Sequence, residues 1–141
     1  KIAATFADGR AAEVFGRMVA AQGGPADFVD RYTDLLPRAA VVVPVTMPEA
    51  GFVSAIDGTA LGHAVVHLGG GRLRGGDRID PAVGLSDLAP LGEEIAPGEP
   101  FALVHAAGAA EAERAVAEVR AAYRFGATAP DLPPLVLERI G

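Results

Sequence analysis

The sequence predicts an α+β domain preceded by a short helical segment. After about residue 40, β-branched segments and glycine- or proline-marked turns alternate with two stretches of helical periodicity, whereas the first part shows helical periodicity only. We therefore expect a mixed or antiparallel sheet with helices on one side. The expected parts are a helical segment over 1–36, a linker and edge strand over 37–50, and the main domain over 51–141.

The first segment has the start and stop signals of two helices. Asp8 is a suitable N-cap for a helix over residues 9–22, and glycines follow that can end it. Pro25 can begin a second, shorter helix whose buried side would carry Phe28 and Val29. The apolar face of the first helix is formed by Ala11, Val14, Phe15, Met18 and Val19.

Two strands and a capped helix are expected next. Val41–Val45 is β-branched but contains Pro44, which cannot donate to a ladder, so it is predicted to be an edge strand or extended linker. Gly51–Ile56 is predicted to be a strand. Asp57 then caps a helix over residues 58–68. The packing stripe of that helix consists of Leu61, Ala64, Val65 and Leu68.

The remainder of the chain predicts short strands and one more helix. Gly75–Ala106 holds short apolar segments separated by turn residues, which is typical of short β-strands. A helix is expected over residues 109–124, and Leu135–Ile140 is predicted to return as a final strand. The inward face of the helix would carry Ala112, Ala115, Val116, Val119, Ala122 and Tyr123.

Composition and charge exclude several classes of protein. The formal charge is −6 and the arginines are dispersed, which argues against a nucleic-acid surface because such surfaces cluster their cations. Cysteine is absent, so no disulfide, thiolate nucleophile or thiolate metal site is expected. No membrane span or signal peptide is visible, so we expect a cytoplasmic protein. Because the chain begins with Lys1, we expect a piece of a longer protein.

The histidines are candidate metal ligands. His63 and His67 are spaced i, i+4 and share a helix face, but a site needs a third ligand and no glutamate of an HExxH pattern lies between them. His105 would have to come close through the fold. We therefore expect packing or surface histidines, and we expect no metal and no cofactor.

Two groups of carboxylates are candidates for acid–base catalysis. Glu93–Glu94 and the acids within Asp77–Asp80 lie in turn-rich sequence beside glycine and proline. Solvated turn residues are the expected interpretation. No catalytic residue is assigned.

The glycine-rich stretch Gly69–Gly76 is the most informative candidate. Five of its eight residues are glycine, and Arg72 and Arg74 can each bind a phosphate or carboxylate. It follows a helix C-terminus, whereas phosphate cradles normally precede a helix N-terminus, so a nucleotide site is not predicted. We expect a mobile closure loop, with a simple connector as the alternative. Its residues are Gly69, Gly70, Gly71, Arg72, Arg74, Gly75 and Gly76.

Several segments, taken in order, resemble the thymidine and pyrimidine-nucleoside phosphorylase family. Residues 11–29 resemble the last helical segment before the family's C-terminal domain, and residues 51–72 resemble the opening of that domain. Residues 80–85 and 91–95 resemble its middle. The similarity covers nearly the whole chain, and four weak motifs in the correct order are together specific.

The resemblance implies an α/β-hammerhead-like fold and a parent enzyme that is a homodimeric pentosyltransferase. Such enzymes convert a pyrimidine nucleoside and phosphate into the free base and a pentose 1-phosphate; with thymidine, the products are thymine and 2-deoxyribose 1-phosphate. The family's phosphate- and base-binding signature has no match in this chain. The resemblance therefore implies a structural and cleft-closing piece, inactive alone, whose partners are the remaining domains of the enzyme.

A second class of function remains open. Residues 91–105 resemble the strand–turn–strand unit of barrel-sandwich carriers, so a free-standing binding module is the alternative. No Met-Lys-Met attachment site accompanies the segment, which argues against a carrier. A reading frame that extends upstream into the family's Ser-Gly-Arg signature would decide for the phosphorylase.

Overall fold

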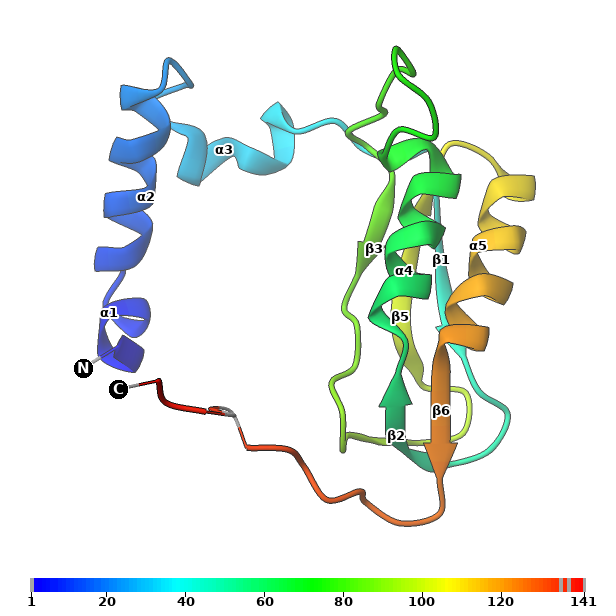
Figure 1. Ribbon diagram of the computed structural model, residues 1–141. Helices are drawn as coiled ribbons and strands as arrows, with labels where there is room; N and C mark the ends of the chain where they lie inside the picture. Colours follow the sequence, from blue (N-terminus) through cyan, green and yellow to red (C-terminus); the bar gives the residue numbers. More distant parts are fainter. Residues whose placement is uncertain (1, 135, 137, 141) are drawn as a thin grey trace. The chain divides into compact units, whose positions relative to one another are not determined.

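The chain forms two compact units, Lys1–Pro37 and Arg38–Gly141. The computed structural model describes residues 2–134, 136 and 138–140. Among the described residues, the first unit contains helices and no strand, and the second contains the strands, two α-helices and a π-helical turn (Figure 1).

The first unit consists of α1 (Ile2–Ala7), α2 (Arg10–Ala21) and α3 (Phe28–Leu35). The sequence did not predict α1, and the predicted cap of α2 is wrong. Gly9, in the left-handed region at φ 81°, is the N-cap residue of α2. Asp8 instead pairs with Arg10, whose side chain and then backbone N–H lower the pKa of the Asp8 carboxyl. Glycine at this position can adopt the left-handed turn between two helices without a steric penalty.

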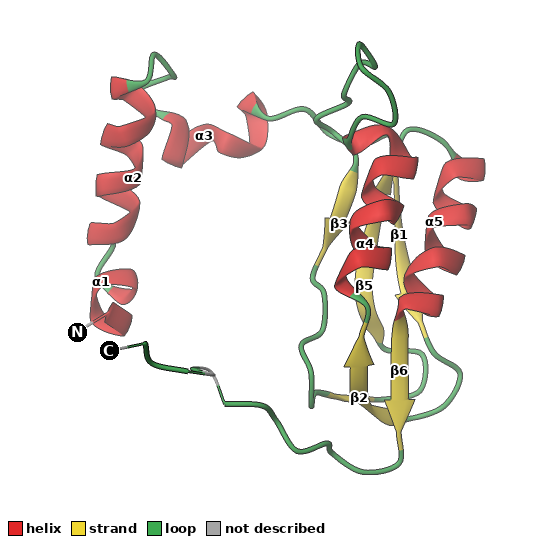
Figure 2. Ribbon diagram, viewed as in Figure 1, coloured by secondary structure: helices red, strands yellow, loops and turns green. Residues whose placement is uncertain are grey.

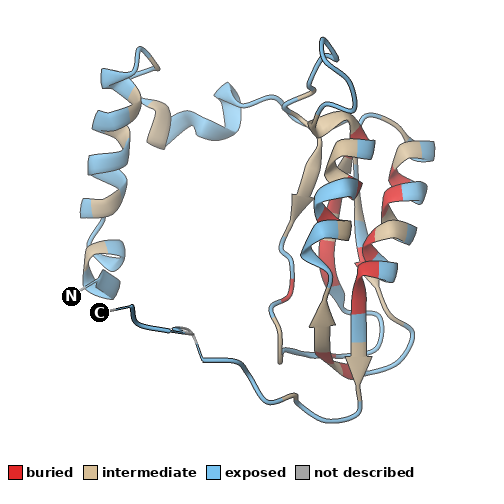
Figure 3. Ribbon diagram, in the orientation of Figure 1, coloured by how far each residue is buried: buried red, intermediate tan, exposed pale blue. Residues whose placement is uncertain are grey.

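The apolar face of the first unit stays open to solvent. None of the residues described between 2 and 36 is buried (Figure 3), and Val14, Phe15 and Met18 of α2 are 54%, 45% and 48% exposed. Phe15 contacts Phe28 of α3 edge to face, with ring centroids 6.0 Å apart. The predicted amphipathic pattern is therefore present, but these helices bury little of it against each other.

The second unit is built on two antiparallel sheets of three strands (Figure 2). One has the strand order β1-β5-β3 and the other β4-β2-β6. The α+β class is confirmed, and of the two kinds of sheet expected, mixed or antiparallel, the described strand pairs are all antiparallel. The strands form two sheets and not the one that was expected. The strands are β1 (Val41–Thr46), β2 (Gly51–Ile56), β3 (Gly84–Ser86), β4 (Glu94–Ile95), β5 (Pro100–Ala106) and β6 (Tyr123–Gly126).

Strand β1 lies at a sheet edge, as its proline predicts. Pro44 is paired in register with Leu103 of β5, and no strand among the described residues pairs with the other side of β1. The Arg120 side chain donates a 3.0 Å hydrogen bond to the Thr46 carbonyl oxygen. A missing donor at Pro44 and a capped acceptor at Thr46 leave few groups for another strand to pair with.

Two helices pack beside the sheets. Helix α4 (Gly58–Val65) continues into the π-helical turn η1 (Val66–Gly70), and α5 (Ala109–Ala122) packs against both and against β1 and β5. The Asp57 carboxylate caps α4 by accepting a 2.9 Å hydrogen bond from the Ala60 N–H, as predicted. In the described part of the chain, no helix combines the length and apolarity needed to cross a bilayer.

The core lies between the sheets and these helices. Phe101 of β5 is fully buried, and its ring centroid lies 4.8 Å from that of Tyr123 and 5.2 Å from that of Phe125. The predicted packing stripes are largely confirmed. The buried members of α4, η1 and α5 are Leu61, Ala64, Leu68, Ala112, Ala115, Val119 and Ala122.

The predicted end of the last helix is wrong, and so is the predicted final strand at the positions that can be tested. Helix α5 ends at Ala122, and Tyr123 begins strand β6, which pairs with β2. Within Leu135–Ile140, residues 136 and 138–140 are not in a strand, and residues 135 and 137 lie outside the described residues. The aromatic side chains of β6 are needed beside Phe101, and this packing overrides the helical pattern.

Candidate functional site

The candidate loop begins where η1 ends. Gly69 has φ 97°, a left-handed conformation that turns the chain out of the helix and that glycine adopts readily. The Asp80 N–H donates a 2.9 Å hydrogen bond to the Gly69 carbonyl oxygen and closes the base of the loop. The predicted loop residues therefore lie on one closed excursion from the end of the helix (Figure 1).

Asp77 holds the interior of the loop. Its carboxylate accepts hydrogen bonds from the backbone N–H groups of Leu73 and Arg74, at 3.1 and 2.8 Å. The Arg72 Nε donates to the Asp77 carbonyl oxygen at 3.3 Å. The carboxylate thus occupies the two amides that an external anion would otherwise use. An anion approaching the loop would meet guanidinium groups instead.

The loop has a packed half and an open half. A Cβ atom on Gly70 would lie 2.9 Å from a Val65 methyl carbon, and one on Gly71 would lie 2.7 Å from a Val66 methyl carbon. A Cβ atom on Gly75 or Gly76 would meet nothing within 4 Å. The first glycines therefore permit close packing on the helix end, whereas the later ones lie at an exposed tip.

The cationic side chains of the loop face solvent. Arg72, Arg74 and Arg78 are exposed, and within residues 2–134 no ion pair is found for any of them. Three guanidinium groups within seven residues give the tip a local positive charge on an acidic chain. This arrangement suits contact with phosphate or carboxylate groups on a facing surface.

The structure does not bring the histidines together as a metal site. The His63 and His67 rings lie 6.4 Å apart, and His67 Nδ1 lies 3.1 Å from a Glu118 carboxylate oxygen. His105 Nε2 lies 2.8 Å from the Ser86 hydroxyl oxygen. No group of three histidine, aspartate or glutamate side chains within the described ranges is arranged to hold a metal ion.

The acids singled out by the sequence have turn-forming roles. Asp77 organises the loop, and the Asp80 carboxylate accepts a 2.9 Å hydrogen bond from the Ala82 N–H. Glu93 and Glu94 are exposed, as expected for solvated acids. The structural role of Asp77 was missed by the sequence analysis. An aspartate following a glycine-rich stretch was the available signal, since aspartate binds nearby backbone amides in turns.

A cross-strand polar pair was also missed. Ser86 ends β3, and its hydroxyl lies 2.8 Å from His105 of β5 and donates to the Asp87 carboxylate at 3.1 Å. Asp87 adopts φ 51°, which is uncommon for a residue other than glycine. Ser86 and His105 are 19 positions apart in the sequence, so only knowledge of the β3–β5 register could have placed them together.

A groove lies beside strand β6. It has a volume of about 670 Å³, and Tyr123, Phe125, Ser54 and Met47 contribute to its walls. The Tyr123 hydroxyl donates to the Ala89 carbonyl oxygen at 3.1 Å. Burial, and then the negative charge of Glu93, raise the pKa of this phenol. The hydroxyl is thus neutral and structural at physiological pH.

Comparison with known families now identifies the second unit. The family model described as the pyrimidine nucleoside phosphorylase C-terminal domain matches residues 52–126, which is more than half of the chain. The match runs from β2 to the last residue of β6, so it includes the glycine-rich loop and both packed helices. The resemblance stated from the sequence is confirmed. The chain belongs to the pyrimidine nucleoside phosphorylase C-terminal domain family.

Proposed function

We propose that this chain is the C-terminal part of a pyrimidine nucleoside phosphorylase, a glycosyltransferase acting on a pentose. In the reaction, a phosphate oxygen bonds to C1′ of the nucleoside as the bond from C1′ to the pyrimidine nitrogen breaks. The base departs with the bonding electrons and takes up a proton. With thymidine, the products are thymine and 2-deoxyribose 1-phosphate. The family match over residues 52–126 is the observation that carries this proposal.

Within that enzyme, the role of the second unit is to close the cleft that holds the substrates. The loop is closed at its base by the Asp80–Gly69 hydrogen bond and organised by Asp77, and it presents Arg72 and Arg74 to solvent. A loop preformed in this way loses less conformational entropy when it docks on a facing surface. Its guanidinium groups would then contact phosphate or carboxylate groups across the cleft. The groups that bind the reacting atoms come from other parts of the enzyme.

The first unit belongs, in this proposal, to the helical domain of the same enzyme. Its helices expose Val14, Phe15 and Met18, and none of its described residues is buried. Exposed apolar side chains on one helix face are typical of a surface that another part of a protein covers. The parent enzyme is proposed to be a cytoplasmic homodimer.

The assay that tests this assignment measures release of thymine from thymidine and phosphate, and of uracil from uridine. We expect no release by the 141-residue chain alone, and release by a protein in which the same residues follow the remaining phosphorylase domains. Phosphate must be required in the active case. Release at enzymatic rates by the isolated chain would contradict the assignment of the reacting groups to other domains. An inactive longer protein that is folded would contradict the proposed reaction.

A further inference from the structure

Helix α5 holds the chain at two points just before the glycine-rich loop begins. His67 lies in η1, two residues ahead of Gly69. Its ring Nδ1 is 3.1 Å from one Glu118 carboxylate oxygen and 3.2 Å from the other. Its carbonyl oxygen accepts a 3.3 Å hydrogen bond from Arg114 Nη2. Both the side chain and the backbone of one residue are therefore bound by the same helix.

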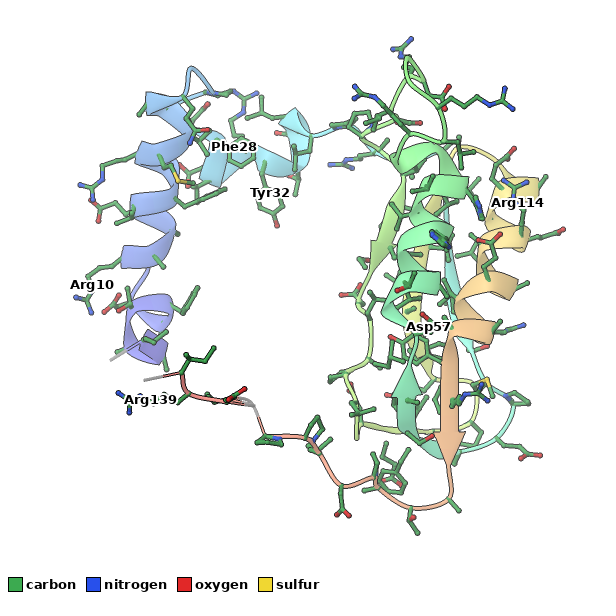
Figure 4. All side chains as sticks on the ribbon, in the orientation of Figure 1. Arg10, Phe28, Tyr32, Asp57, Arg114 and Arg139 are labelled. Atoms are coloured by element: carbon green, nitrogen blue, oxygen red, sulfur yellow. The ribbon has the colours of Figure 1, made fainter. Side chains whose placement is uncertain are left out.

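The two α5 residues are spaced i, i+4 and share one face of the helix. Figure 4 labels Arg114 on α5, in the part of the helix beside η1. The adjoining face of the same helix segment is held in the core, because Ala115 and Val119 are buried at 2% and 0% exposure. The contacts that α5 makes to His67 therefore fix the position of the chain just before Gly69. They set the direction in which the glycine-rich loop extends from the helix end.

Near this anchor the loop is little buried. Leu73 is 69% exposed and shares the walls of a groove of about 360 Å³ with His67, Arg114 and Glu118. The Leu73 side chain therefore lies close to these residues but remains mostly in solvent. Asp77 determines the internal shape of the loop, whereas the contacts of α5 to His67 act on its base.

We propose that His67, Arg114 and Glu118 are positioning residues that aim the glycine-rich loop at its docking surface. This inference rests on the proposed function for its effect on turnover, but not for its effect on the loop. If the contact between His67 and Glu118 were only an ordinary surface ion pair, its loss would have a different effect on the loop. Exposed ion pairs contribute little to stability, so loss of such a pair would leave the loop's motions unchanged.

The first test uses the chain itself and the trypsin sites Arg72, Arg74 and Arg78 of the loop. Glu118→Ala is expected to increase the rate of cleavage at these sites by about fivefold or more, because local opening of the loop base becomes easier. Glu118→Gln, which keeps a hydrogen-bond acceptor for a His67 Nδ1–H, should restore most of the wild-type rate. Glu113→Ala is the matched control on the same helix. Cleavage after Arg139 serves as the internal reference.

Wild-type cleavage rates in Glu118→Ala, with unchanged thermal stability, would overturn the positioning role. So would faster cleavage after Arg124 of β6 to the same extent as in the loop, since that would mean general loosening of the domain. The outcome that supports the proposal is acceleration confined to the loop and reversed by Glu118→Gln.

The second test measures turnover in a phosphorylase that contains this domain. We expect Glu118→Ala to lower kcat by about fivefold with little change in KM for the nucleoside, and Glu118→Gln to recover it. If loop cleavage accelerates but kcat is unchanged, positioning of the loop stands and the proposed closure role of the loop is wrong. If cleavage does not change, the positioning role is wrong whatever the kinetics show.

Discussion

The Asp77 carboxylate accepts a 2.8 Å hydrogen bond from the backbone N–H of Arg74, three residues earlier in the glycine-rich loop. The carboxylate also accepts from the Leu73 N–H at 3.1 Å. The backbone amides of the loop therefore bind the loop's own carboxylate, while the Arg74 guanidinium and the Arg72 N–H groups other than Nε stay exposed to solvent. This relationship explains how a stretch with five glycines in eight residues has a defined shape.

Replacing Asp77 should release the loop without unfolding the domain. In Asp77→Ala, we expect the amide hydrogens of Leu73 and Arg74 to exchange at least about tenfold faster, because local opening no longer breaks two hydrogen bonds. Asp77→Asn keeps an acceptor oxygen, so its exchange rates should lie between those of the wild type and of Asp77→Ala. Hydrogen exchange followed at single residues checks this, with the Ala60 amide as the reference. Equal exchange in all three proteins would show that Asp77 does not hold the loop.

Removing the Tyr123 hydroxyl should destabilise the second unit. Tyr123→Phe leaves the Ala89 carbonyl oxygen without its 3.1 Å partner, at a cost of about 1 kcal/mol in the free energy of unfolding. The ring contact with Phe101 is preserved, so a larger loss is not expected. Chemical denaturation of both proteins measures the difference. No loss of stability would mean that water binds the Tyr123 hydroxyl in the unfolded chain as favourably as the Ala89 carbonyl oxygen binds it in the folded one.

The same residue predicts how stability depends on alkaline pH. Burial, and then the negative charge of Glu93, raise the pKa of the Tyr123 phenol above its ordinary value of 10.0, so the unfolded chain loses this proton first as the pH rises. The stabilising contribution is fully present below pH 10 and is lost as the pH rises through the folded-state pKa. Denaturation midpoints across this range should fall less steeply for Tyr123→Phe. Identical slopes for the two proteins would contradict the raised pKa.

Two glycine substitutions form a matched pair within the loop. Gly70→Ala should destabilise the domain by about 1–3 kcal/mol, because its Cβ would lie 2.9 Å from a Val65 methyl carbon and 3.1 Å from the Val65 carbonyl oxygen. Gly75→Ala meets nothing within 4 Å and should change stability by less than about 0.5 kcal/mol. Thermal unfolding of both variants is the measurement. Equal changes in stability for Gly70→Ala and Gly75→Ala would contradict the division of the loop into a packed half and an open half.

Local signals predicted much of the fold. Strand Gly51–Ile56 and its Asp57-capped helix were predicted correctly, because alternation of side chains and a capping residue act over a few neighbouring positions. Pro44 correctly placed β1 at an edge. The end of α5 was not predictable in the same way. Tyr123 continues a helical pattern locally, but its packing on Phe101 places it in a strand.

At the candidate site, too, features within a short stretch of sequence were predictable, whereas contacts between distant residues were not. The glycines and arginines of the loop are visible in the sequence, and so is the pair His63 and His67. The partner of His67 is Glu118, which is 51 positions away, and this contact depends on how α4 and α5 pack. No spacing rule predicts such a contact. The single sequence therefore identified the loop but not the residues that hold its base.

The most direct test of the closure role is the double variant Arg72→Ala and Arg74→Ala in a phosphorylase that contains this domain. We predict that kcat/KM for thymidine or uridine falls about tenfold or more, equivalent to about 1.4 kcal/mol of transition-state stabilisation, while thermal stability is unchanged. Arg139→Ala, an exposed arginine outside the loop, should have wild-type kinetics. Wild-type kcat/KM in the double variant would contradict the account and show that the loop is only a connector.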